Sequence, residues 1–298
     1  MAEYHSMKPL TQEDYEEFTG ARKTVIIGKT TIEVGKKWNI KRYGPPENYN
    51  HEDETVWSFP NRGDWATHTG KYRGNWSPYI PRNLILEYTV PSETVLDQMC
   101  GSGTTLIECK LLGRNGIGVD VNRDAVIITR DRLNFQYKTN NKKKTRIKTY
   151  VGDARNLDLI DDESVDLIAT HPPYSGRKVE GDLSSLSLSD YVKAMRTVAE
   201  ESLRILKGGR HCAILIGDTR RSRHYVPISH RVLETFLDVG FILKEDVIKL
   251  QWKMKGTREK WGGKRSGFYK IAHEHLYIFR KANPDELLSK VKYSMKLW

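Results

Sequence analysis

Four consecutive residues, His171, Pro172, Pro173 and Tyr174, directly follow the apolar run 165–169. Two prolines in a row stop a strand and fix the backbone, and they leave carbonyl oxygens that no helix uses. A histidine and a tyrosine flank these carbonyls, which places hydrogen-bonding groups and aromatic faces together. The group could serve only to stop the strand. Its position at a strand end, in a chain that also has a glycine-rich turn, favours a reactive loop.

The glycine-rich turn runs from Asp97 to Thr105 with the sequence Asp-Gln-Met-Cys-Gly-Ser-Gly-Thr-Thr. Gly101 and Gly103 lie between a predicted strand and a predicted helix. Glycine lets the backbone approach a ligand closely, and the first N–H groups of a helix attract an anionic group. Alone, this turn would equally suit a tight connection between strand and helix.

Two further aspartates end successive predicted strands. Asp120 ends the second strand, where a carboxylate can accept hydrogen bonds from both hydroxyls of a ribose. Asp153 ends the third strand, where a carboxylate can accept a hydrogen bond from an adenine amino group. Each aspartate alone would be interpreted as a helix cap or a turn residue. Together with Asp97 they predict a site for a dinucleotide or for S-adenosylmethionine.

Strands and helices alternate through most of the chain. The expected strands are 93–97, 116–120, 150–153, 165–169, 212–216, 241–250 and 275–279, and the expected helices are 104–112, 123–135, 188–206 and 229–239. Such alternation predicts an α/β fold with an open, doubly wound, mostly parallel sheet. Ligands bind such sheets at the carboxyl ends of the strands, where the candidate residues lie.

The pattern divides the chain into three parts. Residues 1–56 form an N-terminal accessory segment with a short hairpin around Gly28, and residues 57–281 form the catalytic domain. The first part of that domain, 57–81, is rich in Trp and Tyr without periodicity, which indicates an ordered loop packed on a core. Residues 282–298 are expected to form a C-terminal helix, with Asn283 as N-cap and Pro284 in the first turn.

Composition limits the function classes. The 298 residues carry 49 Lys and Arg against 38 Asp and Glu, and the net charge of +11 favours an anionic partner such as nucleic acid. Three cysteines without a CxxC pair argue against a disulfide framework and against structural zinc, so no metal is expected. No apolar run approaches the ~18 residues of a membrane span. Without a visible signal peptide, we expect a cytoplasmic protein with no membrane partner.

In these motifs the chain resembles the amino-methylating DNA methyltransferases, which form N4-methylcytosine or N6-methyladenine. Their catalytic motif is Ser, Asp or Asn followed by Pro-Pro-Tyr, and their cofactor motif looks like the glycine-rich turn found here. Residues 75–82 resemble the segment that lines the methionine end of the cofactor, and residues 273–281 resemble the final strand motif. The resemblance spans 57–281. It departs from the family at Met99, where Phe is usual, and at His171.

The resemblance implies S-adenosylmethionine as the cofactor and a methyltransferase (Rossmann-like) fold. It also implies direct methyl transfer to a base flipped out of the helix. The Pro172 carbonyl and neutral His171 would accept the two amino protons, and Tyr174 would stack on the base. Because His171 is neither Asp nor Asn, N4 of cytosine is slightly favoured over N6 of adenine. The expected catalytic residues are His171, Pro172, Pro173 and Tyr174, and the expected cofactor contacts are Asp97, Cys100, Gly101, Ser102, Gly103, Thr104, Asp120, Val121, Asp153 and Ala154.

A basic aromatic loop, 249–270, is the expected nucleic-acid contact. It holds eight Lys and Arg residues against one acid, with four aromatic residues among them, and this mixture suits phosphate contact and base stacking. The run 219–224 could add phosphate contacts. DNA is favoured as partner, structured RNA such as ribosomal RNA is the alternative, and a dimer is left open. A nucleic-acid-binding module without activity and a nicotinamide enzyme are the rival classes.

Overall fold

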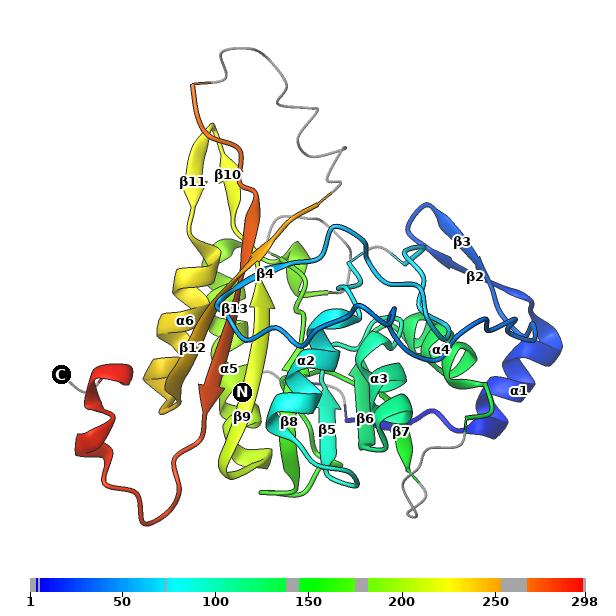
Figure 1. Ribbon diagram of the computed structural model, residues 1–298, viewed down its shortest axis with the longest axis horizontal. Coiled ribbons are helices and arrows are strands. Elements are labelled where there is room, and N and C mark those ends of the chain that lie inside the picture. Colours follow the sequence, from blue (N-terminus) through cyan, green and yellow to red (C-terminus); the bar gives the residue numbers. More distant parts are fainter. Residues whose placement is uncertain are drawn as a thin grey trace.

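The computed structural model describes residues 4, 6–72, 74–137, 145–174, 182–252 and 267–296. Their centre is a mixed sheet of nine strands in the order β1-β7-β6-β5-β8-β9-β13-β12-β4 (Figure 1). Five neighbouring strands of the sheet are parallel to one another. They are β7 (Ile147–Val151), β6 (Asn115–Asp120), β5 (Thr94–Asp97), β8 (Val165–Thr170) and β9 (Leu206–Ile216).

Antiparallel strands complete the sheet on both sides. β13 (His273–Arg280) lies between β9 and β12 (Ile242–Leu250) and is antiparallel to both. The short strands β1 (Lys8–Pro9) and β4 (Val56–Ser58) form the two edges. The predicted fold class, an open, doubly wound, mostly parallel α/β sheet, is therefore confirmed. The chain reverses its direction of travel across the sheet between β5 and β8, the place where such sheets bind ligands.

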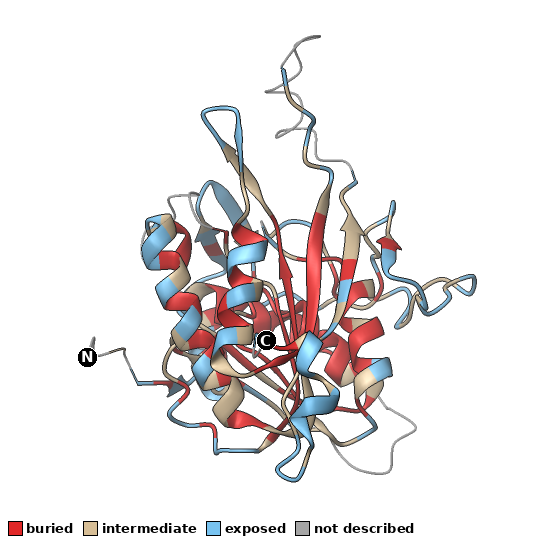
Figure 2. Ribbon diagram, turned by 90° about the vertical axis from the view of Figure 1, so that its left-hand side faces the viewer, coloured by how far each residue is buried: buried red, intermediate tan, exposed pale blue. Residues whose placement is uncertain are grey.

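Helices cover both faces of the sheet. Helices α2 (Tyr79–Tyr88), α3 (Thr104–Leu112) and α4 (Arg123–Leu133) lie on one face, and α5 (Leu188–Ile205) and α6 (Ile228–Val239) lie on the other. Alternate strand residues supply the two cores: Leu96 and Ile168 pack towards α5, whereas Val95 and Leu167 pack towards α2. Figure 2 shows these buried strands between helices whose exposed sides face outwards. Among the described helices, none has both the length and the apolar character needed to cross a bilayer.

The N-terminal segment packs against α4. The predicted hairpin is present as β2 (Thr24–Ile27) and β3 (Thr30–Glu33). Helix α1 (Gln12–Ala21) was not predicted, because its sequence has few apolar residues, although Thr11 and Asp14 form a capping box at its start. The hydroxyl of Tyr15 donates a 2.8 Å hydrogen bond to Asp131 of α4, and this buried contact anchors the helix.

The aromatic segment 57–81 is an ordered, largely irregular stretch, as predicted, and its tryptophans Trp57, Trp65 and Trp76 are buried. A single carboxylate holds much of it. Glu108 of α3 is fully buried and accepts hydrogen bonds from Trp65 Nε1 at 2.7 Å and from Arg82 Nη1 at 2.8 Å, and it contacts His68 Nε2 at 2.7 Å. The ion pair and hydrogen bonds to one buried charge explain why a segment without periodicity is ordered.

The predicted C-terminal helix is wrong for the described residues. Beyond β13 they form only two short 3₁₀ turns, η2 (Leu288–Lys290) and η3 (Lys292–Ser294). Leu287 is 64% exposed, so a helix here would have little apolar surface to bury, and helices of this length need such packing. The Glu286 carboxylate instead ties the chain back to Arg280 of β13.

Candidate active site

The glycine-rich turn connects β5 to α3 in the way the sequence predicts. Gly101 and Gly103 have φ angles of +52° and +77°, in the left-handed region that favours glycine. A Cβ on Gly103 would lie 2.7 Å from Cγ2 of Thr129 in α4. The turn therefore requires glycine at 103 for its backbone conformation and also for its packing.

Asp120, at the end of β6, is joined to this turn. One carboxylate oxygen accepts a 2.8 Å hydrogen bond from the Gly101 N–H, and the other accepts a 2.9 Å bond from the Asn122 N–H. Burial raises the pKa of Asp120 to about 6, although both backbone hydrogen bonds act to lower it. A carboxylate held in this way is poised to accept hydrogen bonds from a ligand beside the turn.

Asp97, at the end of β5, links the glycine turn to the loop after β8. Its carboxylate accepts a 3.0 Å hydrogen bond from the Thr170 hydroxyl and another bond from the Thr105 hydroxyl of α3. Burial raises the pKa of Asp97 to about 6 against these bonds. Because Thr170 is the residue before His171, this contact joins the two strand ends that carry the predicted motifs.

Two residues outside the turn hold it in place. The Asn75 side-chain oxygen accepts hydrogen bonds from the hydroxyls of Ser102 at 3.0 Å and Thr104 at 3.1 Å. The buried guanidinium of Arg132 donates to the carbonyl of Ser102 at 2.8 Å and to the Thr69 carbonyl at 3.0 Å. The segment 75–82, predicted to lie near the cofactor, therefore reaches the turn. The sequence did not predict that Arg132 holds the turn, because a polar residue in a helix normally faces solvent.

Asp153 lies two residues beyond β7, and its carboxylate is engaged within the protein. Nε and Nη2 of Arg155 donate hydrogen bonds of 2.9 and 2.6 Å to its two oxygens. The Arg155 guanidinium also lies 4.2 Å from the centroid of the Tyr4 ring. The contact with Arg155 was not predicted. The Asp153 carboxylate, which was expected to bind adenine, therefore already has a bidentate partner within the protein.

The remaining predicted cofactor residues surround these contacts. Cys100 and Ala154 are buried, whereas Val121 is 45% exposed. Cys100, Cys109 and Cys212 are free and buried, and burial raises the pKa of the Cys100 thiol well above its usual range. The interpretation of Cys100 and Cys212 as small buried hydrophobic residues agrees with this placement. Within the described ranges, no group of three or more His, Cys, Asp or Glu side chains could hold a metal ion.

His171 lies at the end of β8 between two aromatic rings. The Trp76 ring is stacked against it, with centroids 6.0 Å apart and planes 21° apart, and the Tyr174 ring meets it edge-on at 5.4 Å. Tyr174 itself is only 9% exposed, and its ring packs so closely on Gly217 that a Cβ there would lie 2.8 Å from Tyr174 Cε2. Trp76, which was not a predicted site residue, is therefore the ring stacked on His171.

A chain of polar contacts runs from His171 into β13. His171 Nε2 lies 2.7 Å from the Tyr174 hydroxyl, which donates a 2.7 Å hydrogen bond to Oε1 of Glu274. Lys249 of β12 donates a 2.8 Å bond to Oε2 of Glu274. Burial acts to raise the pKa of Glu274, but the charge and hydrogen bond of Lys249 and the hydrogen bond from Tyr174 act against it, and that pKa is lowered to about 2. In the sequence, the one sign of this series of polar contacts was Glu274, an acidic residue inside the apolar strand motif 273–281.

An arm projects beyond the sheet on the side of β12 and β13 (Figure 1). We define the arm as the hairpin of β10 (Thr219–Arg221) and β11 (His224–Val226) together with Trp252 and residues 267–270. Arg220 joins its parts: it donates a 2.6 Å hydrogen bond to the Tyr269 carbonyl and lies 4.6 Å from the Phe268 ring centroid. Tyr269 is 94% exposed. Of the predicted basic aromatic loop, 253–266 lie outside the described residues.

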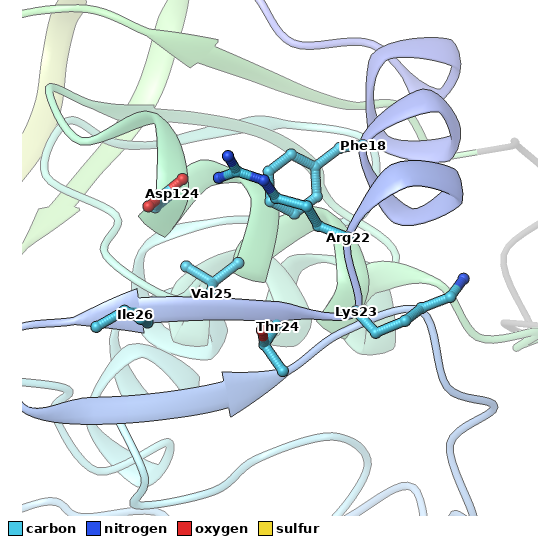
Figure 3. Close-up of a pocket in the computed structure, with 7 residues that line it drawn as sticks. All are labelled: Phe18, Arg22, Lys23, Thr24, Val25, Ile26 and Asp124. Atoms are coloured by element: carbon cyan, nitrogen blue, oxygen red, sulfur yellow. The ribbon is translucent and has the colours of Figure 1, made fainter.

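A separate cavity lies between α1, β2 and the start of α4 (Figure 3). It is lined by Phe18, Arg22, Lys23, Thr24, Val25, Ile26 and Asp124. None of these residues belongs to the strand-end aspartates or to the loop that carries His171.

The family is decided by a match that spans most of this architecture. Residues 10–131 and 165–296 match the family described as DNA methylase. The chain belongs to the DNA methylase family. The predicted resemblance is confirmed, and membership of this family supports the predicted cofactor, S-adenosylmethionine. Residues 86–220 also match the RMKL-like methyltransferase domain.

Relatives of this DNA methylase family protein include an enzyme named for tRNA and enzymes named as type II methyltransferases. It is 28% identical over 176 residues to the tRNA (guanine(10)-N2)-dimethyltransferase of Methanothermobacter thermautotrophicus, covering 58% of this chain and 45% of the relative. It is 28% identical over 183 residues to the type II methyltransferase M.MjaI of Methanocaldococcus jannaschii, covering 49% of this chain and 59% of the relative. It is 37% identical over 76 residues to M2.DpnII of Streptococcus pneumoniae, covering 26% of this chain and 27% of the relative.

The chain thus spans about half or less of the first curated relatives it matches. Among solved structures, it resembles the putative RNA methyltransferase PH1948 of Pyrococcus horikoshii with a TM-score of 0.47 at 17% identity, over 72% of this chain and 87% of that one.

Proposed function

We propose that this methyltransferase transfers a methyl group to the exocyclic amino group of a base in DNA, with N4 of cytosine favoured over N6 of adenine. The hydrogen bond from Thr170 to Asp97 is the observation that carries the proposal. It joins the end of the strand that leads into the His-Pro-Pro-Tyr loop to the end of the strand that leads into the glycine turn. An amino group held by the loop would therefore lie next to a cofactor held by the turn.

The cofactor-binding part of the proposal rests on two strand-end carboxylates and the start of α3. The N–H groups at the start of α3 are available to an anionic ligand group, and the Asp120 carboxylate suits the ribose hydroxyls. Asp97 presents a second buried carboxylate at the same edge of the sheet. S-adenosylmethionine, when bound, supplies an electrophilic methyl group on a sulfonium ion.

The catalytic part rests on hydrogen-bond acceptors in the loop after β8. An exocyclic amino group is a poor nucleophile because its lone pair is delocalised into the ring. The Pro172 carbonyl and neutral His171 would each accept one amino proton, which turns the nitrogen lone pair out of the ring plane and towards the methyl group. The stacked Trp76 ring supports this role, since it fixes the orientation of the His171 imidazole.

Tyr174 receives a different role from the one the sequence predicts. Its ring is buried and its hydroxyl is hydrogen-bonded within the protein. A side chain in this state is better suited to position His171 than to offer a face to a flipped base. The exposed aromatic residues of the arm, Tyr269 and Trp252, are better placed to meet nucleic acid.

Structured RNA is the second candidate substrate, on one specific observation. The relative that aligns with the largest part of this chain among those described above is named for a guanine N2 amino group in tRNA. That group is an exocyclic amine like the two DNA groups, so the same pair of acceptors would serve. DNA is preferred because the DNA methylase match covers both halves of the chain.

Nucleoside mass spectrometry tests the proposal. The protein is incubated with isotope-labelled S-adenosylmethionine and, separately, with unmethylated genomic DNA, tRNA and ribosomal RNA, and each product is digested. Label in N4-methylcytosine is the expected result, label in N6-methyladenine would change the base, and label only in RNA would overturn the DNA proposal. His171→Ala should abolish the label, whereas His51→Ala, an exposed histidine outside the site, serves as the matched control.

A further inference from the structure

We propose that Lys249, Glu274 and Tyr174 form a relay that fixes the proton of His171 on Nε2 and so leaves the lone pair on Nδ1. The inference deepens the proposed function, and rests on it only for its catalytic consequence. The three residues come from strands β12 and β13 and from the loop after β8, and they are joined by contacts of 2.7–2.8 Å.

The direction of the relay follows from counting donors. An ionised glutamate can only accept hydrogen bonds, and the Lys249 ammonium can only donate them. Glu274 is nearly completely buried, beside Lys249, and therefore stays ionised at neutral pH. The single hydroxyl proton of Tyr174 points to Glu274 Oε1. The Tyr174 oxygen can then only accept from His171, so the proton of the neutral imidazole must be on Nε2.

This tautomer matters for the reaction proposed above. A neutral imidazole has one donor nitrogen and one acceptor nitrogen. With Nε2 turned to Tyr174, Nδ1 is the nitrogen able to accept an amino proton from a base. The opposite tautomer would present a donor to the amino group and repel it. Lys249, Glu274 and Tyr174 are thus positioning residues, since they act through His171.

Among the described residues, the relay supplies charged and titratable groups that face His171 from the packed elements. Glu274 acts on it from β13, Lys249 acts on it through Glu274 from β12, and Tyr174 lies within its own loop. Trp76, on the other side of the ring, carries no charge. Within the relay, the positive charge of Lys249 therefore balances the negative charge of Glu274.

Glu274→Gln tests the relay because it should reverse the two hydrogen bonds that link residue 274 to Tyr174 and Tyr174 to His171. The single amide oxygen of glutamine would take the Lys249 donor, and the amide N–H would point to the Tyr174 oxygen. Tyr174 would then donate to His171 Nε2, and the imidazole proton would move to Nδ1. ¹⁵N NMR of labelled histidine reports which ring nitrogen is protonated, in the free protein at a pH where the ring is neutral.

We expect the Nε2–H tautomer in the wild type, the Nδ1–H tautomer in Glu274→Gln and a mixture in Tyr174→Phe, which removes the acceptor altogether. Glu245→Gln, on the neighbouring strand β12, is the matched control and should keep the Nε2–H tautomer. The same tautomer in the wild type and both relay variants, or Nδ1–H in the wild type, would overturn the relay. This measurement needs no substrate, so it stays decisive even if no nucleic acid is labelled.

Activity provides a second readout. Glu274→Gln should lower kcat by about a hundredfold with little change in the Kd for S-adenosylmethionine. In a His171→Asn background, the asparagine oxygen accepts the amino proton of the base and has no tautomers to select. Adding Glu274→Gln to this background should therefore change kcat less than threefold. An equal loss of activity in both backgrounds would assign Glu274 a purely structural role.

Discussion

The backbone N–H of Gly101 donates a 2.8 Å hydrogen bond to the carboxylate of Asp120, so the glycine turn after β5 and the end of β6 form one unit. The same carboxylate also accepts from the backbone at the start of α4. A ligand that reaches Asp120 therefore meets a group whose position is set from two sides. Loss of this carboxylate should disturb cofactor binding through the contact itself and through the turn.

Asp120→Ala is expected to weaken S-adenosylmethionine binding by about tenfold to a hundredfold, in line with ~1.5–3 kcal/mol for hydrogen bonds to a charged group. Isothermal titration calorimetry on the free protein measures this change. Asp124→Ala, in the first turn of α4, is the matched control and should leave the Kd within about twofold of the wild type. An unchanged Kd in Asp120→Ala would remove Asp120 from the cofactor site.

Cofactor affinity should depend on pH through Asp97 and Asp120. Burial raises the pKa of each carboxyl to about 6, so below that pH the folded protein holds them protonated. If one ionised carboxylate is required, the Kd should rise about tenfold per pH unit below 6 and stay level above 7. Titrations between pH 5 and 8 measure the slope, and Asp120→Asn should reduce it.

The raised pKa values of Asp97 and Asp120 make folding stability change with pH in the direction opposite to cofactor affinity. Between pH 4 and 6 the folded state binds more protons at these carboxyls than the unfolded state, whose carboxyls have the usual lower pKa. Their contribution to the free energy of unfolding of the cofactor-free protein therefore falls as pH rises through this window. Cofactor affinity rises over the same window, so the two measurements separate binding from folding.

Gly103→Ala should destabilise the protein. The residue has φ of +77°, and the added Cβ would lie 2.7 Å from Thr129 Cγ2. We expect a loss of about 1–3 kcal/mol, seen as a lower Tm in calorimetry. Gly44→Ala is the control, because its Cβ would meet no atom within 4 Å. A Tm in Gly103→Ala equal to that of the control would contradict the close packing of the turn on α4.

Glu108 provides a test of the aromatic segment. Its side chain is fully buried and pairs with Arg82 and His68, so Glu108→Ala leaves those groups without their shared acceptor. Breaking such a buried pair costs about 3–5 kcal/mol, measurable by urea unfolding. Glu201→Ala, which removes a more exposed carboxylate paired with Arg204 in α5, should cost much less.

The elements that could be predicted from the sequence are those with a clear pattern of apolar and polar residues. Strands β5, β6 and β8 and helices α3 and α4 were found because apolar runs alternate with amphipathic ones, and glycine or asparagine marks their boundaries. Asp97, Asp120 and the loop at His171 were placed correctly at one edge of the sheet, since parallel strands bring their carboxyl ends together. Helix α1 was missed because its stability comes from a buried contact with α4.

The parts of the site that were missed are those made by tertiary contacts. Glu274 and Lys249 lie 103 and 78 positions from His171 in the chain, by their residue numbers, and meet its loop only because β13 inserts between β9 and β12. The engagement of Asp153 by Arg155 is local, but a sequence shows only that both charges are present. The burial of Tyr174 depends on the space above Gly217. The hydrophobic periodicity of a sequence does not reveal tertiary contacts of this kind.

The arm should contribute salt-dependent affinity for nucleic acid. Arg223 and Lys270 are exposed on it, and their charges add to the attraction of phosphates. Arg223→Gln combined with Lys270→Gln should weaken binding to duplex DNA and make the slope of log Kd against log salt shallower by about 2. Fluorescence anisotropy at several salt concentrations measures both. The Kd for S-adenosylmethionine should not change, because the arm has no contact with the strand-end aspartates among the described hydrogen bonds.

A control pair separates this local effect from net charge. Lys36→Gln combined with Lys292→Gln removes the same charge at exposed sites on the N-terminal segment and near the C-terminus. If the arm is the contact surface, the control pair should keep most of the wild-type affinity and salt slope. Equal weakening by the two pairs would mean that the overall charge of +11 attracts the nucleic acid, and the arm would then lose its assigned role.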